Sequence, residues 1–166
     1  MTAYSASYNA LKLPDFNSKS FAISNRFLRD NNNTQSIYLI QEWHRLTTEA
    51  LLLIPLAAAV DQPTELTEIS LRFFEILDLI DAITSRLPNT LQLELVAFRN
   101  ELSALGHGQN GIISFHEKTL ELNGKVQGTL SQNKVLANRF IATSSSLTRK
   151  IRDEILYKSD LLDQST

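Results

Sequence analysis

The feature that most constrains this chain is a proline-free run from about Gly111 to Lys158, in which apolar residues recur at steps of three and four. Such spacing places them on one face of an α-helix, and the glycine-rich segment before it is typical of a helix boundary. A continuous helix over this run would extend roughly 70 Å at ~1.5 Å per residue. A compact domain does not need so long a helix to close its core, so we expect it to carry force, position or a signal.

The composition favours an all-α fold. The 166 residues are 43% hydrophobic, which is enough apolar material for one domain with a substantial core. Five glycines and four prolines are too few for the frequent turns of an all-β sandwich. We therefore expect a single helical domain over residues 1–166. Within it, residues 1–33 form a poorly defined N-terminal segment, in which the apolar spacing predicts a short helix from Ser18 to Arg29.

Four further helices are predicted from apolar periodicity and from the turn residues between them. Their expected ranges are Thr34 to Val60, Pro63 to Leu87, Thr90 to Leu105, and the long run that begins after Gly111. Short connections of this kind favour an antiparallel up-down-up-down bundle with a long C-terminal helix. In that arrangement the first helix starts, and the last helix ends, on the same side of the bundle, so the domain could stand on a membrane.

Individual residues predict where these helices begin, bend and end. Pro55 lies inside the first of the four, where we expect a kink or a break. Pro63 suits the first position of the next helix, and Asn89 can cap the one after it. Gly106 is expected to stop that helix.

The long helix contains three residues that bear on its packing. In a heptad frame Asn133 falls in the seam, where it would fix register against another helix; a slightly rotated seam would instead turn Leu130 and Ala137 inward. Gly124 and Gly128 lie one turn apart on one face, and each costs ~1 kcal/mol relative to alanine. They either allow a neighbouring helix to approach closely, as from a second subunit, or are tolerated weak positions.

Charge and composition exclude several classes of partner and site. A net charge of -2 gives no general attraction to nucleic acid, and the basic residues near the end of the long helix are interrupted by acidic ones. The absence of cysteine excludes disulfides and thiolate metal sites. No apolar stretch approaches the roughly 18 residues that a membrane-spanning helix needs.

No catalytic constellation is evident, and we expect neither an enzyme nor a cofactor. His44, His107 and His116 lack the spacing of metal ligands, and the sequence has no Glu-x-x-His pair typical of di-iron bundles. The only weak candidates for ligand binding are Trp43, His44 and Arg45, which could hold a small anionic or polar ligand if they face a cleft. Alternatively, Trp43 belongs to the core and its two neighbours lie in solvent.

Two stretches carry a resemblance to a known family. Residues Leu46 to Leu66 contain a proline and small-residue run before a turn, and Phe115 to Leu147 has a rhythm of Asn133, Leu136 and Ala137. Both are similar to the extracytoplasmic helical sensor region of bacterial hybrid histidine kinases of the trimethylamine-N-oxide sensor type. The resemblance covers about half of the chain and transfers no ligand residues.

This resemblance implies a periplasmic domain of an inner-membrane protein, placed between two membrane helices that lie outside this sequence. We expect a small ligand or a periplasmic binding protein to bind at one end of the bundle and to shift the last helix, which passes the signal to a cytoplasmic kinase. A homodimer through the long helix is expected. The alternative hypothesis is a soluble intracellular adaptor or chaperone bundle whose faces bind another helix.

Overall fold

The computed structural model describes residues 12–30 and 33–163, and every regular element in these ranges is an α-helix. The helices are α2 (Leu13–Asp30), α3 (Thr34–Ala59), α4 (Pro63–Thr84), α5 (Asn89–His107) and α6 (Ile112–Asp163). The predicted all-α bundle with a long C-terminal helix is therefore confirmed. The chain forms two compact units, Met1–Glu121 and Leu122–Thr166, and α6 belongs to both.

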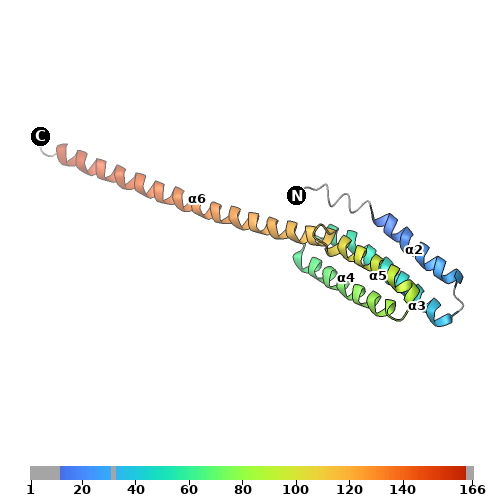
Figure 1. Cartoon of the computed structure of the whole chain (residues 1–166). Coiled ribbons are helices and arrows are strands. Elements are labelled where there is room, and N and C mark those ends of the chain that lie inside the picture. The colour runs from blue at the N-terminus through green and yellow to red at the C-terminus, as the bar shows by residue number, and fades with distance from the viewer. Residues whose placement is uncertain (1–11, 31–32, 164–166) are drawn as a thin grey trace. The chain divides into compact units, whose positions relative to one another are not determined.

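Helices α2 to α5 form an antiparallel four-helix bundle (Figure 1). Packing joins α2 to α3, α3 to α4, and α4 to α5. Two ion pairs connect α2 to α5: Lys19 contacts Glu101, and Arg26 contacts Glu94. Because rising residue numbers on α2 meet falling numbers on α5, these two helices are antiparallel, and the bundle closes on itself.

One hydrophobic core lies between these helices and includes the start of α6. Phe98 is buried at its centre, with its ring centroid 5.3 Å from that of Trp43 and 5.5 Å from that of Phe16. Ile112 and Ile113 bring the first turn of α6 into the same core. Burial of a side chain of this size contributes about 1.5–3 kcal/mol, which is why the apolar face of each helix dictates how it packs.

Helix α2 is longer than the sequence predicts, since it starts at Leu13 rather than Ser18. It packs on α3, and its residues Ile23 and Phe27 are buried in the core. Residues 1–11 and 31–32 of the predicted N-terminal segment lie outside the described residues. Asn33 caps α3, because its side-chain oxygen accepts hydrogen bonds from the next helical backbone amides.

Of three predicted boundary residues, Pro63 behaves as predicted, the helix is not broken at Pro55, and Asn89 does not act as a cap. Pro63 is the first residue of α4, as predicted. Helix α3 runs without interruption through the exposed Pro55 to Ala59, so the predicted break does not occur. The prediction that Asn89 caps α5 is wrong. Pro88 occupies the N-cap position without a side-chain hydrogen bond, and Asn89 is already helical.

Gly106 also differs from its predicted role as a stop residue. Helix α5 continues through it to His107, and Gly106 is buried. A Cβ atom added at this position would lie 2.5 Å from Cζ of Phe73, a ring that is fully buried on α4. Gly106 therefore serves the close packing of α5 against α4 rather than helix termination.

The second unit consists of the rest of α6. The helix is continuous to Asp163, slightly beyond the predicted end, and all residues from Leu122 to Ser159 are exposed. Gly124 and Gly128 do not interrupt it, and nothing lies within 4 Å of a Cβ added at either glycine. Asn133 is exposed as well. The packing roles predicted for these three residues stay predictions, as does the homodimer.

Candidate functional site

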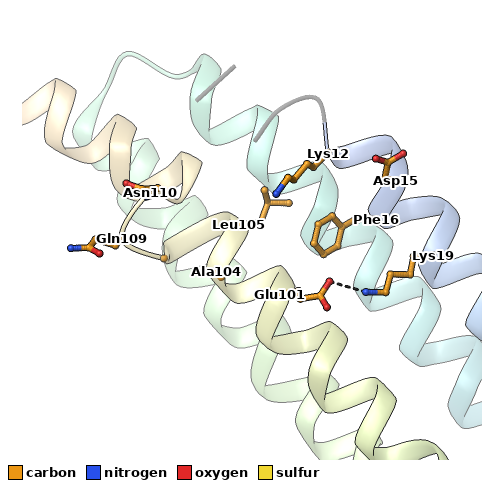
Figure 2. Close-up of a pocket in the computed structure, with 10 residues that line it drawn as sticks. Lys12, Asp15, Phe16, Lys19, Glu101, Ala104, Leu105, Gln109 and Asn110 are labelled. Atoms are coloured by element: carbon orange, nitrogen blue, oxygen red, sulfur yellow. Dashed lines mark hydrogen bonds and ion pairs between the residues drawn. The ribbon is translucent and has the colours of Figure 1, made fainter. Parts of the chain in front are cut away.

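An open groove lies between α2, α5 and the turn that follows α5 (Figure 2). Its volume is about 620 Å³. The residues that line it are Lys12, Asp15, Phe16, Lys19, Glu101, Ala104, Leu105, Gly108, Gln109 and Asn110. All of them belong to the first unit, so the groove is a feature of the bundle itself.

The walls of the groove carry charges of both signs. Lys19 Nζ lies 2.8 Å from Glu101 Oε2, and about half of each side chain is exposed. Asp15 lies one turn before Lys19 on α2. An ion pair this exposed contributes only about 0–1 kcal/mol, because water competes with both partners. A ligand that carries its own charges could therefore replace this ion pair at little cost.

The floor of the groove is apolar. Phe16 is partly buried and packs edge-to-face on Phe98, and Leu105 is 5% exposed. Figure 2 shows Phe16 and Leu105 between the charged side chains of the two helices. An apolar floor with polar groups on its rim is typical of small-ligand sites, in which burial supplies affinity and the polar groups fix orientation. The groove suits a small ligand with a charged group and an apolar part.

The turn at one end of the groove leads directly into α6. Gly108 donates its backbone N–H to Ala104 O at 3.0 Å, and Gly111 donates to Gly108 O at 2.8 Å. A Cβ at Gly108 would collide with the carbonyl oxygen of Ala104, so this tight closure of α5 requires glycine. Gln109 and Asn110 line the groove and are followed two residues later by the start of α6.

His107 joins three helices beside this turn. Its Nε2 lies 3.0 Å from Ser70 Oγ on α4, and its Nδ1 lies 3.3 Å from Ser114 Oγ on α6. The ring stacks on Phe74 at 4.3 Å. Burial lowers the pKa of His107, and the nearby Glu117 opposes this shift only in part. A neutral imidazole donates through one nitrogen and accepts through the other, so it satisfies both serine contacts.

The other two histidines also make contacts between helices. His44 Nδ1 lies 2.8 Å from Ser20 Oγ, which links α3 to α2, and burial lowers the pKa of His44. His116 Nε2 donates to Val60 O at 2.7 Å, which links the start of α6 to the end of α3. Within residues 12–30 and 33–163, no group of three or more histidine, aspartate or glutamate side chains could hold a metal ion.

The structure does not bring Trp43, His44 and Arg45 together. Trp43 is fully buried, His44 is partly buried against α2, and Arg45 is exposed. Arg45 lies 2.6 Å from Glu42 and 2.9 Å from Glu49. None of the three lines the groove. This matches the alternative in which Trp43 belongs to the core, although His44 is not fully in solvent.

The groove residues were missed by sequence reasoning for a physical reason. Asp15 and Lys19 show the spacing of an i, i+4 pair on one helical face, but they lie in a segment predicted to be poorly defined. Glu101 is 82 positions from Lys19 along the chain. Nothing local in the sequence relates these two residues, because only the packing of α2 against α5 brings them together.

Comparisons of the chain with protein-family models, with characterised proteins and with solved structures found no match. The resemblance to the sensor region of histidine kinases therefore stays a prediction. Over the residues that the structure describes, none of the helices combines the length and the apolar character needed to cross a membrane.

Proposed function

We propose that this chain is a signal-sensing input module. In this proposal a small ligand, or a partner such as a periplasmic binding protein, occupies the groove between α2 and α5. Occupation biases two packings of the bundle that differ by a few kcal/mol, and the change passes into α6. The module would belong to a transmembrane histidine kinase as its periplasmic domain, with membrane helices supplied by flanking segments.

The observation that carries the proposal is the continuity of the groove with α6. Gln109 and Asn110 line the groove, and α6 starts at Ile112 without an intervening loop. His107 and Ser114 connect the end of α5 to the first turn of α6, so a shift of the turn must also move this contact. A ligand that pulls on the turn therefore acts on a helix of 52 residues.

A substitution that fills the groove tests this coupling without a known ligand. Ala104 is exposed and lines the groove, so Ala104→Trp places a large side chain where a ligand would sit. Ala82 is also exposed and helical, but it lies on α4 and does not line the groove. Ala82→Trp is therefore the matched control. We expect Ala104→Trp to change amide hydrogen exchange at residues 109–120 by about tenfold, with no such change in the control.

Equal exchange at residues 109–120 in the two variants and the unmodified chain would refute the coupling of groove and helix. A uniform rise in exchange throughout α2 to α5 would show loss of stability rather than coupling. Denaturation followed by circular dichroism distinguishes these cases, because each substitution adds a second tryptophan that would obscure the fluorescence of the buried Trp43. The coupling is supported only when the global unfolding midpoint is retained and the exchange change is local.

A second candidate function is an intracellular helical adaptor, and the exposed apolar side chains of α6 favour it. Phe140 is 75% exposed and Ile155 is 62% exposed, and surfaces of this kind commonly bind another protein. The coding sequence on either side of this region distinguishes the two hypotheses. Flanking apolar segments of membrane-spanning length would support the sensor, whereas their absence would favour the adaptor.

A further inference from the structure

The sequence predicts a homodimer through the long helix, and the exposed side chains of α6 specify where two copies would meet. Nine large apolar residues of the second unit lie on one face of the helix. Seven of them, spaced by steps of three and four residues or their sums, follow its central line, namely Leu122, Val126, Leu130, Phe140, Leu147, Ile151 and Ile155, and Leu136 and Ile141 lie at its edges. These nine, together with Asn133, Ala137 and Ser144 on the central line, are called the α6 seam. Each of the nine large apolar side chains is between 48% and 75% exposed.

The path of the seam follows the turn of the helix closely. The positions Leu122, Val126, Leu130, Asn133, Ala137, Phe140, Ser144, Leu147, Ile151 and Ile155 cover 33 residues in nine steps. This spacing is close to the 11-residue period of a straight or slightly right-handed helix pair, rather than the seven-residue period of a left-handed coiled coil. It places Leu130 and Ala137 in the seam, as in the rotated frame, and keeps Asn133 there as well.

We propose that the α6 seam is an interface between two copies of this chain, which lie in parallel with Asn133 facing Asn133. The central line of the seam is about one residue wide per turn, with Leu136 and Ile141 at its edges, and a face of this width is typical of helix pairs. A helix that lies on a lipid surface has a broader apolar face. The second copy presents the same line with the same period.

Asn133 supports a second copy in parallel orientation. Its amide carries both donors and acceptors, so two facing asparagines satisfy each other, whereas a facing leucine would leave the amide without a partner. In a parallel pair every seam residue meets its own equivalent, and Asn133 is then paired with the one side chain that suits it. This requirement fixes the register of the two helices.

The area of the seam reaches the lower limit for a specific dimer. A leucine-sized side chain presents roughly 100 Å² of apolar surface, and the seam residues expose about half to three quarters of theirs. Two copies would then bury on the order of 1,000 Å² from these side chains alone, which is the size at which specific interfaces begin. Left uncovered, the same surface would favour aggregation.

Gly124 and Gly128 are not part of this interface. Gly128 lies seven residues before Val135, so the two share a face, and Val135 is nine residues after Val126, which places it on the opposite side of the helix. The close approach predicted for these glycines is therefore not what brings two copies together. Their alanine substitutions would leave the proposed dimer intact.

Sedimentation equilibrium of the full chain, from about 1 to about 100 µM, tests the interface. Val126 and Val135 provide a matched pair, because they are 48% and 50% exposed on opposite faces. We expect a dimer whose dissociation constant rises about tenfold or more with Val126→Lys, and further with Phe140→Lys, but not with Val135→Lys. All three side chains are exposed, so unfolding of the bundle is not expected, and Trp43 fluorescence verifies this.

The chain contains no cysteine, which makes a disulfide test of orientation clean. We expect Asn133→Cys to form an intermolecular disulfide under mild oxidation, whereas Val135→Cys should not. A monomer at all concentrations, or equal effects of the two valine substitutions, would overturn the interface. A dimer without the Asn133→Cys cross-link would overturn the parallel alignment. A monomer that binds phosphatidylglycerol vesicles through Val126 and Phe140 would assign the face to lipid and also overturn the proposal.

The interface rests on the seam residues alone, whereas the proposed sensing function rests on the groove and the turn before α6. Loss of the dimer in Val126→Lys would leave the exchange response to Ala104→Trp in place if the groove is coupled to α6. The two experiments can therefore fail separately.

Discussion

Replacement of Gly106 by alanine is the sharpest test of how α5 packs on α4. The new Cβ would lie 2.5 Å from Cζ and 2.7 Å from Cε1 of Phe73, distances that real Cβ atoms essentially never show. Phe73 has little freedom to move, because it is fully buried and its ring contacts those of Phe74 and His107. The substitution therefore forces either the ring or the α5 backbone to shift.

Two opposing effects decide the magnitude. Alanine is favoured over glycine within a helix by ~1 kcal/mol, which would stabilise α5. Overpacking of a dense core costs about 1–3 kcal/mol. We expect the overpacking to prevail and Gly106→Ala to lower the free energy of unfolding by about 1 kcal/mol, whereas Gly128→Ala, with nothing within 4 Å of its Cβ, should stabilise α6.

The assay is urea denaturation followed by the fluorescence of Trp43. It is the single tryptophan of the chain, and it lies fully buried in the core of the bundle, so the signal reports the first unit. A double-mutant cycle with Phe73→Leu isolates the collision, because a smaller side chain leaves room for the alanine methyl group. We expect the two substitutions together to destabilise the bundle less than the sum of the single effects, by about 1–2 kcal/mol.

A Gly106→Ala variant that is as stable as the unmodified chain, or more stable, would refute this reasoning. Additive effects of Gly106→Ala and Phe73→Leu would do so as well, since they would show that the two positions do not contact each other. Either result would show that Gly106 is not needed for close packing against Phe73, and would favour the helix-ending role that the sequence predicts.

Three further outcomes are expected in the same assay. Thr47→Val should raise the free energy of unfolding by about 1–3 kcal/mol, because the buried Thr47 hydroxyl has no hydrogen-bond partner in the described part of the chain. Asn33→Ala should lower it by about 1 kcal/mol through loss of the α3 cap, with Asn33→Ser as the conservative control. Burial lowers the pKa of His44 and His107, so the unfolded chain takes up protons more readily, and stability should fall as pH drops below the ordinary value of 6.5. Replacement of both histidines by glutamine should flatten that pH dependence.

The ion pairs of Arg45 and Arg72 on α3 and α4 should contribute less to the free energy of unfolding than their number suggests. Glu49 contacts Arg45 at 2.9 Å and Arg72 at 2.7 Å, and the hydrogen bond from Arg72 holds the pKa of Glu49 below its ordinary value. These arginines are about half exposed, so solvent screens most of the attraction.

Helices with strong apolar periodicity could be predicted from the sequence because the period is a local property. The α-helical class, the start of α4 at Pro63 and the continuity of α6 all depend on neighbours within a few positions. The predicted role of Asn89 is wrong because α5 begins one residue earlier than expected, so Pro88 is in the N-cap position and Asn89 is inside the helix. Local rules alone do not decide between such neighbours.

The groove could not be predicted, because its charged walls meet only through packing. Lys19 and Glu101 lie on helices that are joined by no local pattern, and His107 contacts serines on two other helices. A different, local reason explains why Trp43, His44 and Arg45 do not form a site. They are adjacent in sequence, but the turn of a helix directs adjacent residues to different faces, so they occupy different environments.

The sequence by itself determined that this chain is helical, where most of the helices begin, and that its last helix is long, since these properties follow from backbone propensity and from period. Only the tertiary structure decided that α2 belongs to the bundle, that Gly106 accommodates a ring of α4, and that a groove lies beside the start of α6. These depend on contacts between residues far apart in the chain, whose free energy is gained only when the helices pack together.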